Sequence, residues 1–310
     1  MTQRNARHDE ALRLRNEGMS YGAIARQLGY GNYPSAARYA VMSAIRNQVS
    51  TNTDNEIRQF GVEAEFFGIT ADQAIEAVRA IGIDIDFDGY THQVMPRWKI
   101  VTDASVSSQG TGRGSGLELV SPIMKGEEGL REVEKVLNAI DGAGGKVNTT
   151  CGLHVHVDTA GMTPIQRKNF FLAYVRNQDM MDRLVSRSRR NNRHYTQRYE
   201  TERAINHYAE AVEDGQGGNS RFYTVNTCSI PKYGTLEFRQ HQGTLNGKKV
   251  VAWVQMLLAV AYTASKTTEE GYTVYNSVEE FLDGNGVDAT TKAYIIRREA
   301  QLNRQATVAA

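Results

Sequence analysis

The stretch Val62-Glu63-Ala64-Glu65-Phe66 decides the fold of this chain, and Leu153-His154-Val155-His156-Val157 repeats its pattern. In both stretches ionisable residues alternate with apolar ones. Successive side chains of a β-strand point to opposite faces, so the two glutamates share one face of the first strand and the two histidines share one face of the second. The pattern predicts strands with an apolar face for helices and a charged face for chemistry.

Two more stretches carry the same alternation, Leu117-Glu118-Leu119 and Leu236-Glu237-Phe238-Arg239. Alternation alone is ordinary, because antiparallel sheets often have one solvated face. Glutamates gathered on one face, however, repel one another. Divalent cations remove that repulsion, Mg²⁺ and Mn²⁺ prefer carboxylate oxygens, and a guanidinium can bind phosphate through two donors. The four strands together therefore indicate a sheet face that holds metals and phosphate.

The remaining sequence mixes strand and helix patterns without strict alternation. This mixture predicts an α+β fold with a largely antiparallel sheet. The expected strands are 59–67, 98–102, 117–121, 152–158, 222–226 and 234–240. The expected helices are 71–81, 127–143, 164–186, 248–265, 277–283 and 290–303.

Residues 1–50 differ from the rest and are expected to form a separate helical module. Helices are predicted over 10–17, over 21–28 after the cap residue Ser20, and from 34 or 35 to about 46. Arginines outnumber acids here, and the string EGMSYGAIARQLGY (17–30) resembles helix-turn-helix modules of resolvase-like and phage regulators. That resemblance implies DNA contact; an appendage that packs on the main domain or on another subunit is the alternative. A polar linker, 49–55, leads into the second domain, 56–310.

Composition favours a globular, cytoplasmic protein. The chain has 310 residues, 40% hydrophobic and 23% charged, and its net charge of +1 excludes a polycation that coats nucleic acid or membrane. The polar N-terminus predicts no secretory leader. The most apolar run, 250–264, is shorter than the roughly 20 residues of a membrane span and predicts a buried helix. Two cysteines, Cys151 and Cys228, are too few for a disulfide framework.

Five motifs follow one another in the order seen in a known family. They are FGVEAEFFG (60–68), WKIVTDAS (98–105), GLELVSP (116–122), CGLHVHVD (151–158) and TLEFRQHQGTLN (235–246). Together they resemble the amidoligase family, which is related to glutamine synthetase and glutamate–cysteine ligase. The resemblance implies a glutamine-synthetase-like antiparallel sheet with ATP and two or three Mg²⁺ or Mn²⁺ ions on its concave face. The implied activity is ATP-dependent carboxylate–amine ligation, which forms an amide through an acyl phosphate.

The resemblance also assigns metal ligands in this chain. Glu63, His154 and Glu237 would hold the metal nearest the ATP phosphates. Glu65 and Glu118 would hold the metal nearest the acyl substrate. The match is imperfect here, since glutamine synthetases usually supply two glutamates near the second of these positions.

Further roles follow from the same resemblance. His156 and Arg239 would contact the transferred phosphoryl group, and Asp103 would replace the missing glutamate or bind the amine. A turn aspartate is the bland alternative for Asp103. A basic element would bind the nucleotide together with Arg239, although a solvated face is the alternative; it comprises Arg189, Arg190 and Arg193. Two polar segments, 109–116 and 187–220, would close the site and protect the acyl phosphate from water.

Other chemistries are less well supported by the motifs. Residues 141–147 lack the spacing and the hydroxyl residue of a phosphate-binding loop, and no G-x-S-x-G motif is present. Zinc on Cys151, His154 and His156 would lack the usual sulfur-rich or helical ligand pattern. Two alternatives stay open: a DNA-binding regulator whose second domain senses a nucleotide or metabolite, and a metal-dependent hydrolase or kinase. The acyl donor, the amine (a free amino acid, a peptide or a protein side chain) and a homo-oligomeric state also stay open.

Overall fold

The structure is a computed structural model that describes residues 3–34, 36–38, 40–41, 58–108, 116–192 and 194–307. The chain divides into two compact units, Met1–Ile57 and Arg58–Ala310. Each unit has its own hydrophobic core among the described residues. The units are therefore described separately.

The first unit contains α1 (Gln3–Asn16) and α2 (Tyr21–Gln27). Gly18 adopts a positive φ of 87° between them, and the Ser20 side chain caps α2 by accepting from Ala23 N at 3.3 Å. Helix α1 begins at Gln3, before the expected start at Glu10. The segment before Glu10 carries no apolar periodicity, so this extension had no signal in the sequence. In the structure His8 is nevertheless buried, as is Ala11. Of the expected third helix, residues 34, 36–38, 40 and 41 are helical, and its remainder lies outside the described residues.

The second unit is built on one sheet with strand order β2-β3-β4-β1-β6-β8-β7, and β5 also pairs with β1. All described pairings are antiparallel except β2 with β3. The expectation of an α+β fold with a largely antiparallel sheet is confirmed. The strands are β1 (Gln59–Phe66), β2 (Ile85–Phe87), β3 (Trp98–Asp103), β4 (Gly116–Val120), β5 (Met124–Lys125), β6 (Gly152–Asp158), β7 (Val225–Asn226) and β8 (Thr235–Gln242).

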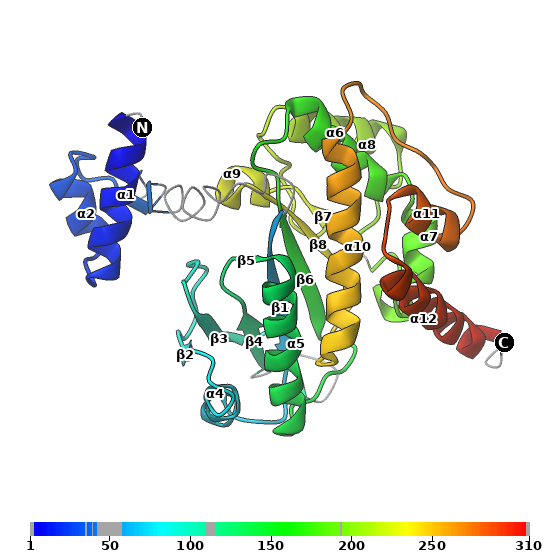
Figure 1. Cartoon of the computed structure of the whole chain (residues 1–310), viewed down its shortest axis with the longest axis horizontal. Helices are drawn as coiled ribbons and strands as arrows, with labels where there is room; N and C mark the ends of the chain where they lie inside the picture. The colour runs from blue at the N-terminus through cyan, green and yellow to red at the C-terminus, as the bar shows by residue number, and fades with distance from the viewer. Residues whose placement is uncertain are drawn as a thin grey trace. The chain divides into compact units, whose positions relative to one another are not determined.

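Helices cover the apolar face of this sheet. In Figure 1, α5 (Gly126–Gly142) and α10 (Gly247–Ser265) run side by side across it, and α10 also packs on α6 (Pro164–Val175). The sheet contributes buried side chains to this layer: Phe60, Val62, Ala64, Phe66, Leu119, Leu153, Val155, Val157, Leu236 and Phe238. The alternation along each strand thus places its apolar members under the helices and leaves the charged members on the other face.

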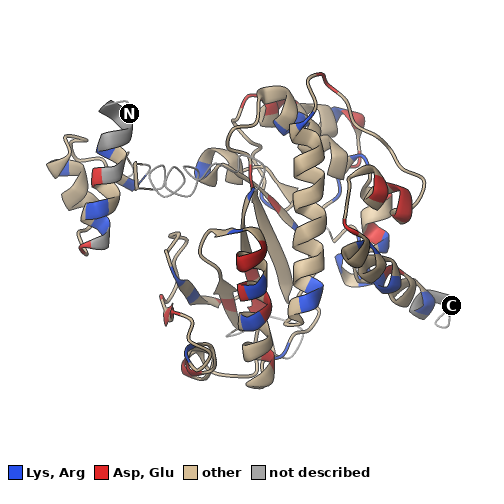
Figure 2. Cartoon of the chain, viewed as in Figure 1, with Lys and Arg blue, Asp and Glu red and all other residues tan. Residues whose placement is uncertain are grey.

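The apolar run within 250–264 forms most of α10. Figure 2 shows this helix almost without charged residues, except at its first turn, where Lys248 and Lys249 lie. Its core contacts include Trp253 and Leu257. In the part of the chain that the structure describes, no helix is both long and apolar enough to cross a membrane.

The predicted helix 164–186 is wrong in its length, because the chain breaks at Asn177 between α6 and α7 (Gln178–Arg183). The Asn177 amide donates to Ala173 O at 2.8 Å and to Thr273 O at 2.9 Å, and its oxygen accepts from Tyr275 N at 3.0 Å. These bonds tie the break to a loop that is remote in sequence.

Three helical elements of this unit were not expected from the sequence: η1 (Arg187–Arg189), α8 (Glu202–Glu213) and α9 (Ser229–Tyr233). The segment 187–220 contains an amphipathic helix, α8, with Ile205 and Tyr208 on its buried side. The expected helices 71–81, 277–283 and 290–303 occur as α4 (Ala71–Arg79), α11 (Val278–Gly284) and α12 (Ala289–Thr307).

The pairing of β6 with β8 contains a β-bulge. Leu153 is the Cα partner of His241, but Val155 is the partner of Phe238, so β8 has one extra residue over this interval. As a result Gln240 and His241 both lie toward the helices. Gln240 accepts from Tyr174 Oη of α6 at 2.8 Å, and the His241 ring lies 5.0 Å from the Trp253 ring of α10.

Candidate functional site

The charged face is organised around β1, which lies between β4 and β6. Glu65 is the Cα partner of Glu118, and Glu63 is the Cα partner of His154. Directly opposite residues on paired strands point to the same face. The strand pairing therefore gathers these four side chains beside one another.

Three groups of side chains come close enough to hold a metal ion. In each group the candidate ligand atoms lie within 4.8 Å of one another. The groups are Glu63, His156 and Glu237; Glu63, Glu118 and His154; and Glu65, Asp103 and Glu118. All of the carboxylates assigned to metals from the sequence occur in these groups.

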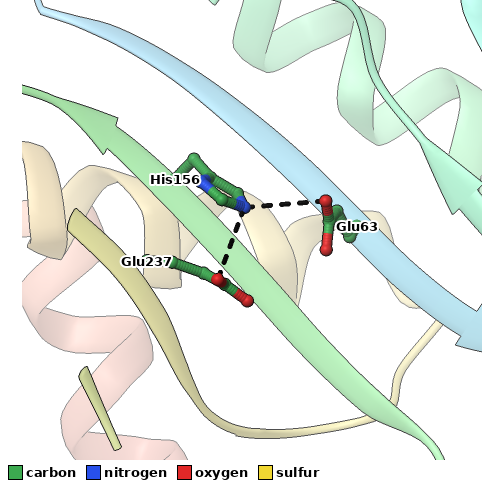
Figure 3. Close-up of side chains that lie close together, drawn as sticks. All are labelled: Glu63, His156 and Glu237. Carbon is green, nitrogen blue, oxygen red and sulfur yellow. Dashed lines mark ion pairs between the residues drawn. The ribbon is translucent and has the colours of Figure 1, made fainter. Parts of the chain in front are cut away.

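Figure 3 shows the first group, in which three strands each contribute one residue. The His156 Nε2 atom lies 3.6 Å from Glu63 Oε1 and 3.9 Å from Glu237 Oε2. The resemblance had placed His154 rather than His156 in this set. The Nδ1 atom of His154 lies 3.3 Å from Glu63 Oε2 and 3.8 Å from Glu237 Oε1, so both imidazoles border the two carboxylates.

Burial and like charge act on these carboxyl groups in opposite ways. Burial raises the pKa of Glu118 well above its usual value, and the charges of Glu63 and Glu65 raise it further. Burial also raises the pKa of Glu63, but hydrogen bonds with His154 and His156 outweigh it and hold that pKa well below its usual range. The like charges of neighbouring carboxylates thus oppose the ionisation of Glu118, and a bound cation would relieve this repulsion.

Two buried guanidinium groups border the carboxylates. Arg239 pairs with Glu237 through its Nη1 atom, and Arg189 Nη2 donates to Arg239 O at 2.7 Å. The Nε atoms of both arginines are buried without a hydrogen-bond partner among the described residues. Burial lowers the pKa of Arg189 to about 10. Both side chains thus retain donor capacity at the site.

The other two arginines of the expected basic element are placed differently. Arg190 donates to Val185 O at 3.1 Å and to Asn303 Oδ1 of α12 at 3.2 Å, so its contacts join the segment after α7 to the C-terminal helix. Arg193 lies outside the described residues. Of that element, Arg189 is the member that the structure places beside the carboxylates.

Asp103 combines the two interpretations that the sequence left open. Its Oδ1 atom accepts from Ser105 N at 2.7 Å and from Ser105 Oγ at 2.6 Å, which is the hydrogen bonding of a turn aspartate. A carboxylate oxygen of Asp103 also lies within 4.8 Å of carboxylate oxygens of Glu65 and Glu118. The turn fixes the position of the carboxylate at the end of β3.

A family model described as "Putative amidoligase enzyme" matches residues 56–261. The chain belongs to this amidoligase family. No curated protein matches the chain. Among solved structures, a bifunctional glutathione synthetase from Pasteurella multocida is similar at 13% identity with a TM-score of 0.37. The match covers 83% of this chain and 48% of that one, so the chain spans about half the length of that structure.

The amidoligase chain brings a glycine to the centre of the site, which the sequence analysis did not single out. A Cβ atom on Gly152 would lie 3.0 Å from Arg189 Nη2, 3.0 Å from His154 Nε2 and 3.5 Å from Glu65 Oε2. Its N–H also donates to Glu65 Oε2 at 2.6 Å. Glycine inside a strand often marks such a close approach, and this was the available signal.

Two polar residues, one in β7 and one in β8, were also missed. Asn226 Nδ2 donates to Glu237 Oε2, and Thr235 Oγ1 lies 2.9 Å from His156 Nδ1. The second contact orients the imidazole so that its Nε2 atom faces Glu63. Thr235 precedes Glu237 by two residues, so the same alternation could have placed it on the charged face.

Proposed function

We propose that this amidoligase is an ATP-dependent carboxylate–amine ligase with a glutamine-synthetase-like active site on the charged face of its sheet. The observation that carries the proposal is the convergence of Glu63, Glu65, Glu118 and Glu237 with two imidazoles and two guanidinium groups. Buried charges are costly unless a ligand or partner compensates them. A site that binds cations and phosphate would provide that compensation.

The residues present fit divalent cations. The donor set consists of carboxylate oxygens and imidazole nitrogens within 4.8 Å of one another, and Mg²⁺ and Mn²⁺ favour such ligands. Glu63 and Glu237, with an imidazole, would hold one ion, and Glu65 and Glu118, with Asp103, would hold another. When bound, the ions would neutralise negative charge on the phosphoryl group.

The proposed reaction has two steps. A carboxylate oxygen of the acyl substrate attacks the γ-phosphorus of ATP and ADP leaves, which gives an acyl phosphate. The amine nitrogen then attacks the acyl carbon, inorganic phosphate leaves, and the amine gives up a proton as the amide forms.

The chain's own residues would serve both steps. Arg239 and Arg189 present buried donors that can contact the transferred phosphoryl group, and a forked guanidinium suits its oxygens. His156, held by Thr235, can donate to the same group. As the alternative to holding the second ion, Asp103 would offer its carboxylate to the amine.

The test is product analysis with the full-length chain. We expect ATP, Mg²⁺ and the right acid and amine to yield one amide per phosphate released, as identified by mass spectrometry. Glu63→Gln should weaken Mn²⁺ binding and abolish most turnover with little loss of fold, whereas Glu128→Gln, on the exposed side of α5, serves as the matched control. Phosphate release without an amide would favour a hydrolase, phosphate transfer to the substrate a kinase, and nucleotide binding without turnover a sensor.

The N-terminal unit supports a further, separate proposal, that residues 1–50 contact DNA. The described part of this unit has a core of its own, which includes Leu12 and Ile24. Arg7 and Arg26 are exposed, whereas Arg13 is paired with Glu10 and Glu17. Exposed arginines on a small independent core suit contacts with phosphates.

A further inference from the structure

Residues 88–97, which we call the strap, connect β2 to β3 and extend over the charged face. The strap leaves the sheet beside β3, where Asp88 N donates to Ile100 O at 3.0 Å. At its base an ion pair of 2.7 Å joins Arg97 Nη2 to Asp88 Oδ1. Its two ends are therefore held together, and the residues between them form a loop.

The tip of the strap is tied down by three consecutive backbone carbonyls. Lys99 Nζ donates to Thr91 O at 3.3 Å and to Gln93 O at 2.5 Å. From the other side, Tyr233 Oη donates to His92 O at 3.2 Å. Because carbonyls of three successive residues accept from side chains of β3 and α9, both the position and the orientation of this tip are fixed.

These anchors place the tip above β1. Lys99 belongs to β3, and Tyr233 ends α9, one residue before β8 begins. Strands β4, β1 and β6 lie between β3 and β8. Lys99 is the Cα partner of Val120, which is the partner of Glu63, so Lys99 projects from the charged face. The Tyr233 ring packs edge-on against the His156 ring at 5.8 Å. The tip therefore covers the end of the site where Glu63 and His156 lie.

Lys99 is an unusual anchor because its side chain is buried, with 2% of its surface exposed. Burial lowers the pKa of Lys99. Among the described residues no carboxylate forms an ion pair with its Nζ atom, which donates instead to two carbonyls of the strap. A buried ammonium group is costly, and an uncharged residue would fill this position without that cost.

The surroundings of the strap are basic. His92 experiences the positive charges of Lys232, Arg221 and Lys99 and the negative charge of Glu63. Lys232 Nζ lies 4.7 Å from the ring of Tyr233, next to the anchor. Positive groups around an entrance raise the local concentration of anions such as polyphosphates.

We propose that Lys99 and Tyr233 are positioning residues that latch the strap over the phosphate groups of bound nucleotide, which closes this end of the site to water. The inference rests on the proposed function for the identity of the anion beneath the strap. It deepens that function by assigning the nucleotide phosphates to the Glu63–His156 end. The acyl and amine substrates then enter from the end of the face marked by Asp103.

The test is hydrogen–deuterium exchange of the full-length chain with a mass-spectrometric readout. Tyr233→Phe removes one hydrogen bond but keeps the ring, and exchange in residues 90–95 should become about fivefold faster. Lys99→Met keeps the length of the side chain and should have a larger effect. Exchange in β1 and β6 should stay unchanged in both variants, which separates loss of the latch from loss of the fold. Tyr262→Phe, an exposed tyrosine on α10, is the matched control.

The nucleotide dependence completes the test. Mg²⁺ with AMP-PNP, a non-hydrolysable ATP analogue, should slow exchange in residues 90–95 of the wild type. The decrease in exchange rate should be smaller in both variants. Unchanged strap exchange in the two variants would overturn the latch. If calorimetry shows that AMP-PNP binds but exchange in residues 90–95 does not slow, the proposed position of the strap over the nucleotide would be overturned. Absence of AMP-PNP binding to the wild type would contradict the proposed function, and faster exchange in the variants would then still support the latch.

Discussion

Replacing Gly152 by alanine tests the close approach at the centre of the site. The new Cβ atom would lie 3.0 Å from Arg189 Nη2 and 3.0 Å from His154 Nε2. Ordinary contacts begin near about 3.5 Å, so each neighbour must move by roughly 0.5 Å. Both neighbours are buried, with 3% and 4% of their surface exposed, and have little room to retreat.

Two losses should follow from this displacement. Overpacking of a buried position costs about 1–3 kcal/mol in the free energy of unfolding. A misplacement of about 1 Å can reduce turnover about 100-fold, so roughly half that shift should reduce it about tenfold. Urea denaturation measures the first loss. Mn²⁺ titration and ATP turnover measure the second.

Gly142→Ala provides the control. This glycine ends α5, and a Cβ atom there would meet nothing within 4 Å. Alanine in a helix is favoured over glycine by about 0.5–1 kcal/mol, so this variant should be slightly more stable and fully active. If Gly152→Ala matched this control in stability, Mn²⁺ affinity and turnover, the close approach at Gly152 would be refuted.

Three further predictions use other parts of the chain. Arg239→Lys should lower ATP turnover at least about tenfold, because lysine cannot present a forked donor to phosphate; unchanged turnover would remove Arg239 from the phosphoryl site. Burial lowers the pKa of His241 to about 3 in the folded protein, whereas an imidazole in the unfolded chain has a pKa of about 6.5. As the pH falls below about 6.5, the unfolded state therefore binds a proton that the folded state does not. The free energy of unfolding should then decrease by up to about 1.4 kcal/mol per pH unit. Urea denaturation from pH 7 to 4 should show a shallower fall for His241→Gln, and an identical slope would contradict this. Deletion of residues 1–50 should leave ATP turnover largely intact, and DNA affinity of the full chain should decline steeply with added salt; insoluble protein or a flat salt response would count against these two points.

The strands of the charged face were predictable because their signal is local. Alternation with a period of two fixes the face of every side chain in β1 and β6 without knowledge of the neighbouring strands. Glu63, Glu65 and His154 could therefore be assigned to one face from the sequence. Each of the expected strands occurs in the structure, although β7 is shorter than predicted.

Features that depend on distant residues were not predictable in the same way. The break at Asn177 requires hydrogen bonds to Thr273 and Tyr275, nearly a hundred residues away. The proximity of His156 to Glu63 as well as to Glu237 depends on which strands flank β1. The separate positions of Arg189 and Arg190 depend on a single 3-10 turn, after which the second side chain bonds to α12. Side-chain periodicity carries none of this information.

The bulge in β8 determines how many imidazoles the metal groups can contain. If alternation continued unbroken from Arg239, His241 would share the charged face with it, whereas the bulge turns His241 toward Trp253. A third imidazole there would make the site nitrogen-rich, and nitrogen-rich sites favour zinc and copper over magnesium. One backbone irregularity thus keeps the ligands of these groups mostly carboxylate oxygens, the ligand type that suits magnesium, and keeps a further nitrogen ligand away from them.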